Sequence, residues 1–169
     1  MPTGLMQSSS AVAIGFVLNE SAANTFSQGS VDLNLSPLDR EVFVVTAINM
    51  DPLEPDAIAA TNTATNTSLT TTTQTGVQNL GNANCLATAK LAIRAAGFAD
   101  GGVGFTRLVE TPAATVDYIG IIATNDFFVQ IEGLQNATAK AVAGKVYGYR
   151  AKASADIYAA LVQSEVLSA

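Results

Sequence analysis

Residues 117–133 read DYIGIIATNDFFVQIEG and carry the clearest strand signal in the chain. Two apolar runs, 118–123 and 127–132, are rich in β-branched and aromatic residues, which favour strands. Between these runs, Thr124-Asn125-Asp126 has the composition of a turn. We therefore predict two strands here, joined as a hairpin or as one bent strand, within a mainly β fold.

Residues 142–151, VAGKVYGYRA, alternate with the period of two that a strand requires. Gly144 and Gly148 fall on the same face as Val142 and Val146. A glycine in a strand lets another backbone or side chain approach closely. We expect such an approach on this face, so that a bulky residue at Gly148 would impair packing or assembly.

Further strands are predicted from alternation and composition. Residues 11–18 and 31–35 alternate larger apolar residues with small or polar ones, which indicates one buried and one exposed face. Residues 41–49, EVFVVTAIN, form a nearly continuous β-branched run, which is typical of a strand buried on both faces. Residues 103–110 resume a strand after a glycine-rich turn at 101–104.

Two segments have helical patterns instead. In residues 79–96, NLGNANCLATAKLAIRAA, strong helix formers repeat at spacings of three or four, and Gly97 follows as a stop signal. Near the C-terminus, Ser154 can cap a helix whose apolar residues pair at i and i+4. The predicted fold is a mainly β antiparallel sandwich or jelly-roll-like domain with one internal and one C-terminal helix; an α+β sheet is the alternative.

The chain divides into a short arm and one domain. Residues 1–10, MPTGLMQSSS, are mostly polar and lack periodicity, which predicts a flexible N-terminal arm. Residues 11–169 are expected to form a single β-rich domain. Within it, the Thr- and Asn-rich residues 57–78 carry no charge and predict an ordered excursion against a neighbouring subunit, with a flexible loop as the alternative.

The composition favours association. Only 13% of the 169 residues are charged, against roughly 25% in an ordinary soluble domain, while 49% are hydrophobic. A small monomer with so few charges has difficulty covering its apolar surface, and contact with other copies is the usual remedy. No stretch reaches the ~18–20 apolar residues of a membrane span, so none is predicted.

The charge pattern argues against strong nucleic-acid contact, because the net charge is −6 and phosphate binding needs clustered Lys and Arg. Four of the eight basic residues, Lys140, Lys145, Arg150 and Lys152, lie close together in the sequence near the C-terminus. They predict either a solvated strand face or a basic surface that meets the acidic N-terminal half of an identical subunit.

The residue types that most catalytic sites use are scarce. The chain has no histidine, which removes Ser-His-Asp and Cys-His catalysis and the commonest metal ligand. Its single cysteine, Cys85, excludes an internal disulfide and a multi-cysteine metal site, and its apolar surroundings predict a buried thiol. We therefore predict a protein that is not an enzyme, with no catalytic, cofactor-binding or metal-ligating residues.

Two weaker candidates for a binding site remain. The acidic turn Asp51-Pro-Leu-Glu54-Pro-Asp56 contains carboxylates that could coordinate calcium, but it lacks the EF-hand spacing and also fits a rigid exposed turn. Gly102-Val103-Gly104 has a superficial likeness to a dinucleotide-binding loop. It follows a predicted helix instead of a strand, and Arg107 stands where the third glycine should be, so we reject this interpretation.

In general character the chain resembles small virion coat proteins, whose β-rich subunits are abundant in Ala, Thr, Ser and Asn. The resemblance is carried by residues 61–76 (TNTATNTSLTTTTQTG), by 117–133 and by 147–169 (YGYRAKASADIYAALVQSEVLSA). It implies a capsid or coat subunit that self-assembles into a large homo-oligomer in the virion, with other virion proteins as further partners. It assigns no functional residue.

Two other functions stay open at this point. A cellular surface or filament subunit, located at the cell surface or outside the cell, would share the same composition. A small-ligand or carbohydrate-binding β domain would use the turn at 51–56 or the glycine loop at 101–104. The symmetry of an assembly, icosahedral shell or helical filament, does not follow from the residues.

Overall fold

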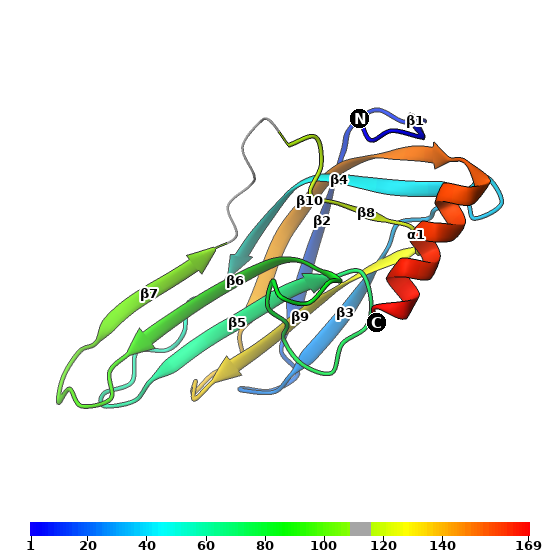
Figure 1. Ribbon diagram of the computed structural model, residues 1–169. Coiled ribbons are helices and arrows are strands. Elements are labelled where there is room, and N and C mark those ends of the chain that lie inside the picture. The colour runs from blue at the N-terminus through cyan, green and yellow to red at the C-terminus, as the bar shows by residue number, and fades with distance from the viewer. Residues whose placement is uncertain (109–115) are drawn as a thin grey trace.

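The computed structural model describes residues 1–108 and 116–169, which form two antiparallel β-sheets packed face to face, with a helix against the outside (Figure 1). The helix, α1, lies at one end of the sandwich, whereas β5, β6 and β7 extend away from it at the other end. The main part of the fold prediction, an antiparallel sandwich with a C-terminal helix, is confirmed.

Sheet A is formed by the described strands in the order β1–β10–β4–β8, and β2 also pairs with β10. The long strands β10 and β4 pair over almost their whole length, so β1 and β2 share the other side of β10 and pair with its two ends. The bounds are β1 (Leu5–Gln7), β2 (Val12–Asn19), β4 (Glu41–Pro52), β8 (Gly120–Ile122) and β10 (Ala141–Ala153).

Sheet B has the strand order β3–β9–β5–β6–β7, again antiparallel throughout its described strands. Its central strand, β5, is therefore paired on both sides. The bounds are β3 (Ser27–Asp32), β5 (Thr63–Thr70), β6 (Cys85–Arg94), β7 (Val103–Leu108) and β9 (Asp126–Leu134).

The main core lies between the two sheets. Phe16 of β2 and Phe127 of β9 meet edge to face across it, with ring centroids 6.0 Å apart and an interplanar angle of 74°, a favoured aromatic geometry. The buried residues of this core are Phe16, Leu33, Leu35, Phe43, Val45, Ile48, Leu69, Ala87, Ile122, Phe127, Val129, Ile131, Val142 and Val146.

The glycines of β10 give the close approach that their spacing predicts, and the partners belong to the same chain. A Cβ atom at Gly148 would lie 2.6 Å from Cε1 of Phe43 and would overlap the carbonyl oxygen of Val44. A Cβ atom at Gly144 would lie 2.5 Å from Cζ of Phe16. Real Cβ atoms do not approach other atoms so closely, so these two positions must be glycine for the phenylalanine rings to pack against β10.

The helix α1 (Ala155–Leu167) covers part of the outer face of sheet A. Ser154 is its N-cap and accepts a hydrogen bond from the Ile157 backbone N–H, as predicted. The helix is also held by Glu165, a buried carboxylate that accepts hydrogen bonds from the backbone N–H of Ala123 (2.9 Å) and the hydroxyl of Thr124 (2.5 Å). This second contact joins the last turns of the helix to the segment after β8.

The predicted internal helix over residues 79–96 is wrong, because this segment contains the strand β6. Its alanines have high helix propensity, but pairing with β5 and β7 overrides that weak preference. The pattern that the structure uses is the alternation of Ala87 and Ala89, which are buried, with Thr88 and Lys90, which are partly exposed.

Residues 117–133 do contain two strands, but these strands do not form a hairpin. β8 pairs with β4 in sheet A, and β9 pairs with β3 and β5 in sheet B. The chain therefore crosses from one sheet to the other at residues 123–125. Turn residues alone cannot distinguish this crossing from a hairpin, because both need the same local chemistry.

The other strand predictions agree with the structure, with shifted boundaries. The predicted strands at 11–18, 41–49 and 142–151 correspond to β2, β4 and β10, and 31–35 overlaps the end of β3. The predicted strand at 103–110 corresponds to β7, with 109–110 outside the described residues.

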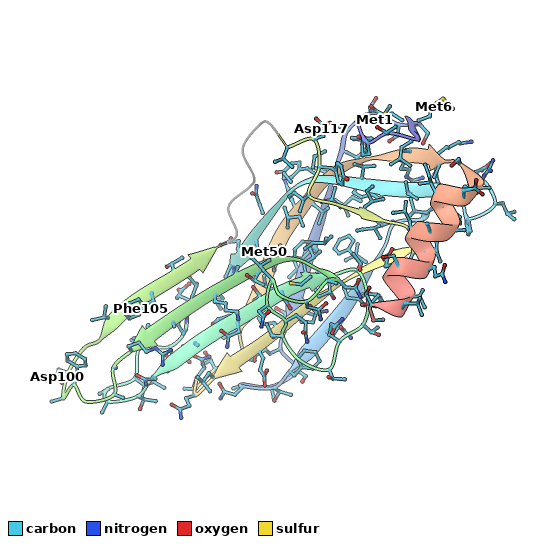
Figure 2. All side chains as sticks on the ribbon, in the orientation of Figure 1. Met1, Met6, Met50, Asp100, Phe105 and Asp117 are labelled. Atoms are coloured by element: carbon cyan, nitrogen blue, oxygen red, sulfur yellow. The ribbon has the colours of Figure 1, made fainter. Side chains whose placement is uncertain are left out.

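The N-terminal residues 1–10, expected to be a flexible arm, contain β1. Leu5 is buried beneath α1, and the N-terminal ammonium lies 3.1 Å from the carboxylate of Asp117. Figure 2 shows Met1 and Asp117 on the same side of the molecule. The segment 57–78, expected to be an excursion, supplies β5 to the middle of sheet B, and its residues 71–78 continue as an ordered loop over the outer face of the same sheet.

Replacing Gly148 with Val is expected to destabilise the fold, because β4 and Phe43 leave no room for a side chain. Overpacking of this kind costs about 1–3 kcal/mol, and the overlap with backbone places Gly148→Val at the upper end. The matched control is Gly104→Val, a strand glycine with no heavy atom within 4 Å of the added Cβ. Urea unfolding measures both; equal stability of the two variants would contradict the proposed contact.

Candidate binding groove

One end of the outer face of sheet B is covered by the chain itself. Residues 71–84 leave β5 and return to β6, and a hydrogen bond from Thr71 N–H to the Asn84 carbonyl closes the loop at 2.9 Å. Within it, the Gln78 N–H donates to the hydroxyl of Ser68 (3.1 Å) and the Gln74 N–H donates to the amide oxygen of Gln28 (2.9 Å). The loop therefore shields this part of the sheet from solvent.

The polar side chains under the loop satisfy one another. Ser68 donates to the side-chain oxygen of Gln130 (2.7 Å), and the Gln130 amide donates to Thr70 (2.7 Å) and to Gln28 (2.9 Å). Ser68, Thr70 and Gln130 are fully buried. Buried polar groups of this kind are tolerated because each has a partner, so the Thr-rich segment is ordered by contacts within one chain.

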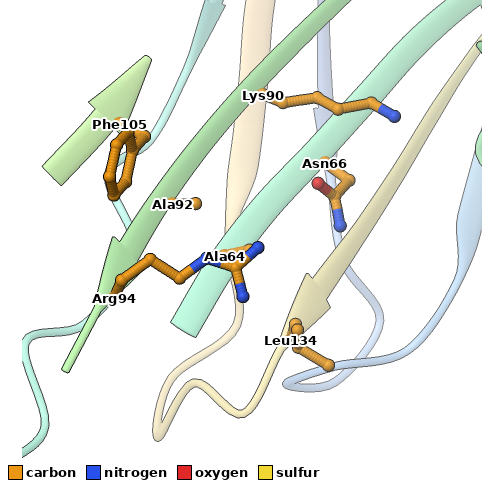
Figure 3. A pocket seen from close by; sticks show the side chains of 7 residues that line it. All are labelled: Ala64, Asn66, Lys90, Ala92, Arg94, Phe105 and Leu134. Atoms are coloured by element: carbon orange, nitrogen blue, oxygen red, sulfur yellow. The ribbon is translucent and has the colours of Figure 1, made fainter. Parts of the chain in front are cut away.

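The remaining part of this outer face is open and forms a groove of about 270 Å³ (Figure 3). Four neighbouring strands contribute its lining through residues that point away from the core. The lining residues are Ala64, Asn66, Lys90, Ala92, Arg94, Phe105 and Leu134.

The strand register explains why the face is hollow here. Phe105, Ala92, Ala64 and Leu134 stand opposite one another on β7, β6, β5 and β9. The two alanines form a low floor, while Phe105 and Leu134, 51% and 46% exposed, stand at its two sides. Figure 2 shows Phe105 on the part of sheet B that lies away from α1.

The groove carries two cationic side chains. Lys90 and Arg94 both lie on β6 and reach over β5, on either side of the alanine floor (Figure 3). Neither forms an ion pair within 4 Å in the part of the chain that the structure describes. Asn66 stands between Lys90 and the acidic Glu132 on one cross-strand row. The groove therefore suits a ligand that combines an apolar group with negative charge.

This groove was not predicted from the sequence. In a strand, Lys90, Ala92 and Arg94 are two positions apart and therefore lie on one face, so their spacing indicates the groove once the segment is known to be a strand. Because residues 79–96 have a helical pattern, that face was assigned to a helix.

The predicted basic cluster near the C-terminus is largely neutralised within the chain. Lys140 lies 2.6 Å from Asp56, Arg150 lies 3.8 Å from Glu41, and Lys152 lies 3.7 Å from Asp39. Lys145 is exposed. Residues that are close in the sequence thus do not form one basic surface, because the acidic partners come from other segments.

The acidic turn at 51–56 does not bring its carboxylates together. Asp51 and Glu54 are exposed, whereas Asp56 is turned toward Lys140. Asp56 also accepts hydrogen bonds from the backbone N–H of Ala137 and Thr138, both at 2.9 Å. Among the described residues, no group of three or more His, Cys, Asp or Glu side chains is placed to hold a metal ion.

Lys140 and Asp56 form a structural ion pair. Lys140 is 4% exposed, and its hydrogen bond to Asp56, together with the Thr138 N–H, lowers the pKa of that carboxyl from its ordinary 3.8 to about 2. Beside the pair, the buried Glu20 accepts hydrogen bonds from the backbone N–H of Gly133 (2.5 Å) and Lys140 (2.7 Å). The network joins β2, β9 and β10 at the end of the sandwich opposite α1.

The other sequence candidates also have clear positions. The glycine loop borders a second hollow of about 400 Å³, lined by Ala57, Ile58, Ala59, Ile93, Ala95, Gly101, Gly102 and Gly104. This lining has no charged side chain to orient a ligand. Cys85 is buried, as predicted, and burial raises the pKa of its thiol.

Comparison with protein-family models, with curated proteins and with solved structures gave no match to the chain. In the described residues, no helix is both long enough and apolar enough to cross a membrane. The arrangement of the sheets and the groove is therefore the basis for a functional proposal.

Asp56→Asn should destabilise the fold at neutral pH, because it leaves the buried Lys140 ammonium without a countercharge. A carboxyl with a lowered folded-state pKa stabilises the fold above its unfolded pKa, and this stabilisation is lost as pH falls toward the folded value. The stability gap between the two proteins should thus be full above about pH 5 and shrink toward pH 2.

Urea unfolding of both proteins at a series of pH values measures this gap. The control is Asp100→Asn, which changes an exposed carboxylate and should leave stability nearly unchanged at every pH. A gap between wild type and Asp56→Asn that stays constant from pH 7 to about pH 2 would contradict the role assigned to the pair.

Proposed function

We propose that this chain is a structural, self-assembling subunit, and specifically a capsid or coat subunit of a virion. The observation that carries the proposal is the strand order. When the short β1 and the outermost β7 are set aside, sheet A reads β2–β10–β4–β8 and sheet B reads β3–β9–β5–β6. If these eight strands are counted along the chain, sheet A has the order first, eighth, third, sixth, and sheet B has the order second, seventh, fourth, fifth. This is the strand order of a jelly roll.

A jelly roll is one of the double-sheet folds used by viral capsid proteins, and also by lectins and cupins. The strand order therefore supports the proposal without selecting among these uses, since one fold hosts many functions. The surface favours assembly. Large apolar side chains are exposed on several elements, among them Leu38 (96%), Val17 (70%) and Met6 (69%). On a chain with only 13% charged residues, contact with other subunits would bury part of this apolar surface.

Two further functions are alternatives. A cellular surface or filament subunit would use the same exposed apolar residues and would form fibres. A carbohydrate- or small-ligand-binding domain would use the groove on sheet B, where Phe105 offers an aromatic face and Asn66 a polar group. We place assembly first because the strand order and the low charge content concern the whole chain, whereas the groove is one local feature.

The purified chain should elute from a sizing column as a large species and appear as shells or regular fibres by negative-stain microscopy. Shells support a capsid subunit, whereas long fibres fit both a helical virion coat and the filament alternative. A monomer that stays monomeric at high protein concentration would contradict assembly. Such a monomer, if retained on an immobilised glycan, would support the ligand-binding alternative.

A further inference from the structure

The groove on sheet B has the form of a receptor for a short acidic segment with an apolar residue between its charges. Its floor is formed by Ala64 and Ala92, and Phe105 borders it on one side. Lys90 and Arg94 lie four residues apart on one strand, which separates their Cα atoms by about 13 Å. An occupant therefore needs an apolar centre with a negative charge on each side.

The chain itself carries such an acidic segment at residues 51–54, which are the last two residues of β4 and the two that follow it. Asp51 and Glu54 are exposed, and neither has an ion-pair partner in the described ranges. Between them lies Leu53, which is 45% exposed. Asp51 and Glu54 are three positions apart in the sequence, so their Cα atoms are at most about 10 Å apart, and the long Lys and Arg side chains can span the difference.

The acidic segment is also held in place before any partner binds. The Leu53 N–H donates to the Ala141 carbonyl at 2.8 Å, which continues the pairing of β4 with β10, and Pro52 and Pro55 are buried. Because proline fixes one backbone angle, little conformational entropy remains to be lost when such a segment docks.

We propose that residues 51–54 of one copy dock in the sheet B groove of a second copy. Leu53 packs on the alanine floor, and the two carboxylates pair with Lys90 and Arg94. This inference rests on the proposed self-assembly and identifies one contact within it. The charges are complementary, and each charged side chain involved is unpaired within the described part of its own chain.

The contact is between copies because the two surfaces belong to different sheets. Asp51 stands opposite Ala143 in sheet A, whereas the groove lies on the outer face of sheet B. A contact between two different surfaces is heterologous, so each copy offers its acidic segment to one neighbour and its groove to another. Such contacts continue from copy to copy and generate rings or extended assemblies, as a shell or a fibre needs.

The test uses charge reversal in the full chain. Lys90→Glu with Arg94→Glu should raise the protein concentration needed for assembly at least about tenfold, because like charges then meet in the contact. Asp51→Lys with Glu54→Lys should have the same effect. The variant with all four changes should assemble again, and so should an equimolar mixture of the two double variants.

The control variant is Lys145→Glu with Asp100→Lys, which reverses two exposed charges outside the groove and the acidic segment and should assemble as wild type does. Circular dichroism checks that every variant is folded. If wild type assembles and the groove double variant assembles equally well, the docking contact is wrong while self-assembly stands. The docking contact is also wrong, and self-assembly stands, if both double variants fail to assemble and the fourfold variant does not assemble either. If wild type itself stays monomeric, the proposed function fails, and this contact fails with it.

Discussion

The sandwich depends on the packing of phenylalanine rings between β10 and the opposite sheet. Phe16 and Phe43 seat over Gly144 and Gly148, and Phe16 also meets Phe127 from sheet B. Because interiors are packed as densely as organic crystals, a ring can occupy this space only where the strand below has no side chain. The spacing of two glycines in one strand thus sets where the two sheets meet.

Sheet B combines a core face that is largely apolar with a polar central strand. A strand rich in Thr and Ser is stabilised in the middle of a sheet when its hydroxyl groups find partners, since an unpaired buried polar group costs about 1–3 kcal/mol. In β5 the buried hydroxyl of Thr65 has no such partner within the described residues. The loop at 71–84 and the side chain of Gln130 supply those partners along one part of β5. The loop does not reach Ala64 and Asn66, where the groove lies. The loop therefore stabilises the part of β5 that it covers, and it leaves the groove exposed because it does not extend over the rest of the strand.

The sequence was informative where one strand's own pattern determines its structure. β4 and β10 follow directly from β-branched and alternating residues, and Ser154 marks the start of α1. The strand β6 could not be predicted from its own residues, because its alanines favour a helix and only pairing with β5 and β7 makes the segment a strand. The groove could not be predicted for the same reason, since it is defined by residues that meet across four strands.

Ion pairs were equally inaccessible to reasoning along the chain. Lys140 and Asp56 are 84 positions apart, and the basic run near the C-terminus gave no sign that its members are paired with acids from distant segments. The structure therefore changes which basic residues are available for contact with a partner. Lys140, Arg150 and Lys152 pair with acids of the same chain, whereas Lys90 and Arg94 on β6 and the exposed Lys145 on β10 have no ion-pair partner among the described residues.

The described edge of sheet B gives an independent reason to expect neighbouring subunits. β7 is the outermost described strand, and it presents Val103 and Phe105, each about half exposed. An edge strand with exposed apolar residues tends to recruit other chains, and monomeric proteins protect such edges with charge, proline or a covering element. Phe105 also borders the groove, so a copy docked there would bury part of this edge in the same contact. Burial of the edge and pairing of the groove cations would then stabilise one interface together, which links the apolar composition of the chain to a specific surface.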